Sequence, residues 1–190
     1  VVNPSWTIPP TILRKDVLPA MRSDPSYAER RGYEVFRNGR RVDPASVDWS
    51  NPRGVSFRQP PGERNALGRI KFMFPNDFAV YIHDTPTRNL FSAERRTLSS
   101  GCVRVDRPFQ LAEYVLGEGW SERCLKSLLD SKGERTIGLP RKIPVHLTYF
   151  TLTRDADGQW IRRDDVYGFD RTVQAALGLP VGHNVAKVTP

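Results

Sequence analysis

Residues 69–83, RIKFMFPNDFAVYIH, contain two short runs rich in β-branched and aromatic side chains, RIKFMF at 69–74 and FAVYIH at 78–83. The segment between them, Pro75-Asn76-Asp77, has the composition of a turn. Two such runs joined by a turn predict a β-hairpin. Because the hairpin follows Gly68 and a stretch rich in proline, we expect it to begin a sheet-containing core.

Helices and a further hairpin are predicted after this first hairpin. Asp106 is placed to cap a helix with Pro108 in its first turn, and Ser121 to cap a second helix that carries Cys124. Residues 145–153 are the longest strand candidate, and a turn at 155–158 leads into another strand. The sequence therefore predicts an α+β fold that is mainly β with short helices.

Short elements separated by prolines fill the N-terminal third of the chain. We expect a helix that opens at Pro10 and ends or kinks at Pro19, a second short helix after Pro25, and a hairpin that turns at Asn38-Gly39. Residues 50–63 have the composition of a loop. The pattern predicts three parts: a strand stub at Val1-Val2 followed by an N-terminal lobe, together 1–66, a core at 67–169 and a weakly patterned tail at 170–190.

Composition limits the possible functions. The 190 residues include 29 Lys and Arg against 21 Asp and Glu, a formal charge of +8. This charge suits an anionic partner or simply a solvated surface, and the dispersal of the basic residues argues against nucleic-acid binding. Two cysteines and three scattered histidines predict neither a disulfide framework nor a zinc site. No run approaches the ~20 apolar residues that a membrane helix needs.

The strongest chemical candidates are Cys102 and His83. Gly101 directly precedes the thiol, so a substrate carbonyl can approach closely, and backbone amides in such a turn can hold an oxyanion. Arg104 lies two residues further on, where its guanidinium can favour a thiolate or bind a carboxylate. His83 ends a predicted strand and can act as the general base. A buried structural cysteine remains the alternative for Cys102, as does a disulfide with Cys124.

Two segments carry a resemblance to a known family. Residues 83–91, HDTPTRNLF, followed by 99–105, SSGCVRV, resemble the catalytic signature of the L,D-transpeptidases that remodel bacterial peptidoglycan. The family has a histidine, about fifteen residues, then Ser/Thr-His-Gly-Cys, a hydrophobic residue and Arg or Asn. Fifteen residues separate His83 from Ser99 here, and Ser100 replaces the usual histidine. With this serine, the sequence Ser-Ser-Gly-Cys resembles that of a large periplasmic subgroup, whose members have an inserted substrate-capping lobe.

The resemblance implies a fold and a site. It implies a β-sandwich core with an inserted helical and hairpin capping lobe, with Cys102 as nucleophile and His83 as base. The backbone carbonyl of Asp84 would orient the imidazole. The remaining site residues that it implies, for the oxyanion or the substrate, are Arg104, Gly101, Ser99, Ser100, Tyr81 and Trp6. For Trp6, a role in anchoring the lobe to the core is equally open.

The resemblance also implies an activity. Cys102 would form a thioester with a tetrapeptide stem, release D-Ala and pass the acyl group to a second stem as a 3→3 crosslink. Peptidoglycan stems are the implied partners and carbapenems the implied inhibitors, with no cofactor and no metal. Hydrolysis by an L,D-carboxypeptidase is the alternative, and a non-catalytic wall-binding module is a third. The start at Val1-Val2 without Met suggests that upstream regions, including any export or anchoring segment for the periplasm, precede this part.

Overall fold

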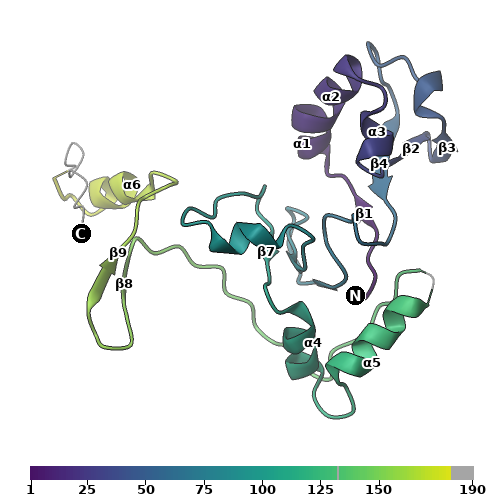
Figure 1. Ribbon diagram of the computed structural model, residues 1–190. Helices are drawn as coiled ribbons and strands as arrows, with labels where there is room; N and C mark the ends of the chain where they lie inside the picture. The colour runs from purple at the N-terminus through teal and green to yellow at the C-terminus, as the bar shows by residue number, and fades with distance from the viewer. Residues whose placement is uncertain (132, 181–190) are drawn as a thin grey trace. The chain divides into compact units, whose positions relative to one another are not determined.

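The computed structural model describes residues 1–131 and 133–180, and the chain divides into two compact units, Val1–Ile143 and Pro144–Pro190. The first unit holds two small sheets and most of the helices, and residues 144–180 of the second hold a hairpin and one helix (Figure 1). This is a mixed α+β fold, so the fold class expected from the sequence is confirmed. The three-part division at residues 66 and 169 stays a prediction, and residues 181–190 of the expected tail lie outside the described residues.

A four-stranded antiparallel sheet forms the centre of the N-terminal lobe. Its strand order is β1-β4-β2-β3, with β1 at Trp6–Thr7, β2 at Glu34–Arg37, β3 at Arg40–Val42 and β4 at Val55–Gln59. β2 and β3 form the expected hairpin, and both turn residues have positive φ, 49° at Asn38 and 78° at Gly39. These angles fit the type I′ turn that an Asn-Gly pair favours.

Strand β4 corrects one expectation, because residues 50–63 had the composition of a loop. Its side chains alternate, with Phe57 fully buried and Gln59 5% exposed while their neighbours face solvent. This two-residue period marks a half-buried strand. Phe57 packs edge-on against Tyr33, with ring centroids 6.0 Å apart.

The first helical stretch also differs from expectation, because it continues through Pro19. The stretch consists of α1 at Pro10–Ile12, a π-helical turn η1 at Leu13–Val17 and α2 at Leu18–Ser23. Proline inside an α-helix removes a hydrogen bond and clashes with the carbonyl four residues earlier. The wider π turn directly before Pro19 relieves that conflict, so the helix continues without a break.

Short helices surround the lobe sheet (Figure 1). α3 spans Tyr27–Arg30 and η2 spans Pro44–Ser46. Buried side chains from these helices and from the sheet form one hydrophobic cluster: Ile8, Val17, Met21, Ala28, Tyr33, Val35, Val47, Trp49 and Phe57. Burial of such side chains is the main force that holds the lobe together.

A three-stranded sheet, β5-β6-β7, lies in the core. β5 spans Lys71–Phe72, β6 spans Ile82–His83 and β7 spans Val103–Arg104. β5 and β6 pair antiparallel and form the predicted hairpin, although each strand is only two residues long. A 3-10 turn, η3 at Arg88–Ser92, interrupts the loop between β6 and β7.

Helices that pack in a second buried cluster complete the first unit. α4 spans Pro108–Leu116, α5 spans Glu122–Ser127 and η4 spans Leu128–Asp130. Ser121 caps α5 as expected, whereas Arg107 rather than Asp106 occupies the N-cap of α4 and makes no side-chain cap bond there. This second buried cluster joins these helices to the isolated bridge between Val2 and Ile70, next to β5: Val2, Ile70, Ala112, Leu116 and Leu125.

The second unit departs furthest from expectation. Its strands are β8 at Leu152–Arg154 and β9 at Trp160–Arg162, so only the end of the predicted strand 145–153 is a strand. Strand structure requires a neighbour, and residues 145–151 pair with none of the described strands. The expected tail also contains a helix, α6 at Phe169–Ala176. None of the helices in the described ranges is long and apolar enough to cross a membrane.

Candidate active site

Strands β6 and β7 bring the two halves of the sequence signature together. They pair in parallel, with Ile82 opposite Val103 and His83 opposite Arg104. The Val103 amide donates to the carbonyl of Tyr81 at 3.0 Å. Because Cys102 directly precedes β7, this register fixes the backbone of the candidate nucleophile next to that of the candidate base.

His83 is held in one orientation by the backbone. Its side chain is buried, and the ring Nδ1 bonds to the carbonyl oxygen of Asp84. A carbonyl can only accept, so Nδ1 carries the hydrogen and Nε2 of the neutral ring has a free lone pair. The imidazole is therefore in the tautomer that a general base needs.

The Asp84 carboxylate is the centre of a buried network around the histidine. It accepts from the backbone amides of Arg69 and Thr85, each at 2.7 Å, and from the Arg88 guanidinium at 2.6 Å. Its side chain is only 5% exposed. Arg88 also donates to the carbonyls of Val105 and of the residue that follows it. This network ties the segment after β6 to the segment after β7.

Gly68 makes room for that carboxylate. Its φ is +60°, and a Cβ atom there would lie 2.4 Å from both Cγ and Oδ2 of Asp84. Both the positive φ and the close approach require a residue without a side chain. Gly68 is thus part of the support for the His83 ring, although it contacts no reacting atom.

The loop before Cys102 is also internally bonded. The Ser99 hydroxyl donates to the Cys102 carbonyl at 2.7 Å and accepts from the Gly101 amide at 3.3 Å. The Gly101 φ is +119°, and a Cβ atom there would lie 3.1 Å from a Val80 methyl group. Cys102 has a free, half-buried thiol. Within residues 1–131 and 133–180 its amide has no backbone or side-chain acceptor, which leaves it available for an oxyanion.

Arg104 lies opposite His83 in the sheet, and only part of its guanidinium forms hydrogen bonds with the described residues. Nη1 donates to the Leu98 carbonyl at 3.0 Å. The Nε atom is buried and has no partner among the described residues. Because an unsatisfied buried donor is costly, this group is suited to an anionic ligand.

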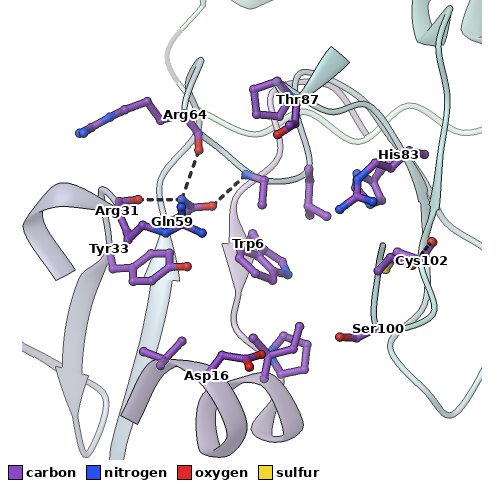
Figure 2. A pocket seen from close by; sticks show the side chains of 18 of the residues that line it. Trp6, Asp16, Arg31, Tyr33, Gln59, Arg64, His83, Thr87, Ser100 and Cys102 are labelled. Carbon is purple, nitrogen blue, oxygen red and sulfur yellow. Dashed lines mark hydrogen bonds between the residues drawn. The ribbon is translucent and has the colours of Figure 1, made fainter. Parts of the chain in front are cut away.

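These residues open onto a cavity of about 680 Å³, a volume within the range of ligand pockets. His83 and Cys102 lie on one wall, Tyr33 and Gln59 lie on the other, and Trp6 lies between them (Figure 2). No group of three or more potential metal ligands occurs in the described part of the chain.

Comparison with known proteins identifies the family of this chain. The model of the YkuD family, the L,D-transpeptidase catalytic domain, matches residues 1–147. The chain belongs to the YkuD L,D-transpeptidase family. A Haemophilus influenzae protein named "Putative L,D-transpeptidase" is 41% identical over 181 residues. That alignment covers 93% of this chain but 37% of the relative, so the chain corresponds to little more than a third of that protein.

The L,D-transpeptidase domain places most of the expected site residues together. His83, Ser99, Ser100, Cys102 and Arg104 all line the cavity. Trp6 lines it from the lobe. Gly101 adjoins the thiol, and Asp84 supports His83 from behind.

Tyr81 is placed elsewhere. It is not among the residues that line the cavity. Instead, the Lys71 ammonium lies over its ring, 5.6 Å from the ring centroid. Sequence reasoning missed the contributions of Gly68 and Arg88. The segment 83–88, HDTPTR, did contain a signal for Arg88, because Arg88 lies four residues after Asp84 and can pair with it. No local sequence feature connected Gly68 with Asp84.

Burial lowers the pKa of His83 below its ordinary value of 6.5, and the charge of Arg104 lowers it further, against the opposing influence of Asp84. A general base works only while it is neutral, so a lower pKa extends activity to more acidic pH. We expect the acidic limb of the kcat/KM profile to lie below pH 6.5. Replacing Arg104 with glutamine should move this limb to higher pH, whatever happens to its height. A limb that stays in place in the variant would contradict the electrostatic coupling.

Proposed function

We propose that this domain is a cysteine L,D-transpeptidase that joins peptidoglycan stem peptides by 3→3 crosslinks. The observation that carries the proposal is the placement of His83, at the end of β6, and Cys102, directly before the parallel strand β7, on one wall of a single cavity. The family supports peptidoglycan as the substrate class, and the periplasm is accordingly the proposed place of action.

The proposed first half of the reaction acylates the enzyme. Nε2 of His83 takes the thiol proton as the Cys102 sulfur attacks the carbonyl between meso-diaminopimelate and the terminal D-Ala. The negative charge on the resulting tetrahedral oxygen is held by the backbone amides of Cys102 and Gly101, the latter after exchanging Ser99 for the substrate. The C–N bond then breaks, His83 returns the proton to the leaving amine, and a thioester remains on Cys102.

In the second half the side-chain amine of another stem attacks the thioester. His83 accepts a proton from that amine, the C–S bond breaks and Cys102 regains its proton. The new amide is the crosslink. Arg104, whose Nε has no partner within residues 1–131 and 133–180, orients a carboxylate of the stem during both halves.

Product analysis tests the proposed reaction. We expect a purified tetrapeptide stem to yield D-Ala and a crosslinked dimer in a ratio near one to one, measured by mass spectrometry. A tripeptide stem, which lacks the bond to D-Ala, serves as the control and should give no dimer. Tripeptide with no dimer, even with a second stem in excess, would instead favour the L,D-carboxypeptidase reaction, because water would then be the acceptor.

A further inference from the structure

The lobe side of the cavity carries positive charge that the proposed chemistry does not use. Three arginines line it there, Arg30, Arg31 and Arg64, together with the carboxylates of Asp16 and Glu63. Arg30 is paired with Asp24 and Glu63 with Arg69. None of the ion pairs among the described residues includes Arg31 or Arg64.

A buried amide fixes the backbone that carries these two arginines. Nε2 of Gln59 donates to the Arg31 carbonyl at 2.8 Å and to the Arg64 carbonyl at 3.2 Å, while its Oε1 accepts from the Ala66 amide at 2.8 Å. Gln59 is the last residue of β4 and is 5% exposed. A buried side-chain amide with all these bonds made holds its partners firmly.

Of the two arginines, Arg31 is the one held beside the cavity-facing aromatic groups. Its guanidinium lies over the Tyr27 ring, 5.9 Å from the centroid. It lies next to Tyr33, across the cavity from His83 and Cys102 (Figure 2). The Arg64 guanidinium instead lies against Gly32, where a Cβ atom would be 3.2 Å away.

Tyr33 supplies a second donor at the same place. Burial raises the pKa of its hydroxyl above the ordinary value, against the opposing influence of Arg31. The hydroxyl therefore keeps its proton across the physiological range. A planar guanidinium and a phenol hydroxyl side by side form a donor set that matches a carboxylate.

We propose that Arg31 and Tyr33 form a carboxylate-binding subsite on the lobe wall, which holds the donor peptide by a carboxylate remote from the scissile carbonyl. This inference rests on the proposed function, since it presumes a peptide donor acylating Cys102. It assigns the lobe a role in substrate selection: peptides that lack this carboxylate are poor donors even when their scissile bond is unchanged.

Replacing Arg31 with glutamine should therefore raise the KM for a tetrapeptide donor about tenfold, with kcat within about twofold of the original enzyme. Arg31→Lys, which keeps the charge but loses the fork, should recover part of the affinity. Arg40→Gln removes the same charge from the exposed lobe hairpin, outside the cavity, and should leave KM unchanged.

Donors with one carboxylate amidated at a time give the second arm. With the original enzyme, amidating one of these carboxylates should lower kcat/KM about tenfold relative to the unmodified donor. With Arg31→Gln, the same amidation should cause no further loss of kcat/KM. Alkylation of Cys102 by iodoacetamide, followed by mass spectrometry, should proceed at the same rate in all variants and shows that the site is intact. Equal KM values for the Arg31→Gln and original enzymes would overturn the subsite, whereas absence of turnover in the original enzyme with every donor would overturn the proposed function.

Discussion

Replacing Cys102 with alanine is expected to reduce D-Ala release and crosslinking by at least about 10³-fold, because the variant has no atom that can carry the acyl group. The same change should abolish covalent labelling by a carbapenem, which intact-mass spectrometry detects as one adduct per chain. Stability should change little, since the thiol is only half buried at the cavity surface.

The matched control is Cys124→Ala. This second free cysteine lies in α5 and is not among the residues that line the cavity. We expect Cys124→Ala to keep full activity and the carbapenem adduct. If Cys102→Ala crosslinked stems as fast as the original enzyme, the thioester route through Cys102 would be wrong.

The second large effect is expected at Gly68. Alanine there places a Cβ atom 2.4 Å from the Asp84 carboxylate, at a φ of +60°. The positive φ costs about 1 kcal/mol, and displacing the carboxylate from its buried donors adds about 1–3 kcal/mol for each bond lost. We expect the free energy of unfolding, measured in urea, to fall by about 4 kcal/mol. The activity that remains should be reduced as well, because the Asp84 carbonyl orients His83.

Gly39→Ala separates strain from steric conflict. Gly39 has a similar φ, +78°, but nothing lies within 4 Å of the Cβ position. It should therefore lose only the conformational part, about 1 kcal/mol. Equal losses in the two variants would mean that the Asp84 carboxylate is not held in the tight setting described above.

Local sequence signals predicted much of this structure. The Asn38-Gly39 turn, the Ser121 cap and the pairing of β5 with β6 depend on residues close in the chain. The spacing between His83 and Cys102 also predicted that both would contribute to one site, and both line the same cavity. Patterns of this kind carry their information within a few residues or within one motif.

The features that were missed depend on contacts between distant segments. Prolines and arginines around β4 hid its alternation, and only pairing with β1 and β2 makes it a strand. The second unit shows the reverse, because residues 145–151 have strand composition but no partner among the described strands. The close approach of Gly68 to the Asp84 carboxylate arises only when β5 pairs with β6, so composition alone cannot indicate it.

The parallel register of β6 and β7 has a consequence for how such enzymes can diversify. Backbone bonds from Val103 to Tyr81 and from Val105 to His83 set the spacing of base and thiol without help from the connecting segment. Residues 89–97 of that segment can thus change length or composition independently of the chemistry. None of residues 89–97 lines the cavity, so exchanging this stretch as a unit should leave both the strand pairing and the cavity lining intact.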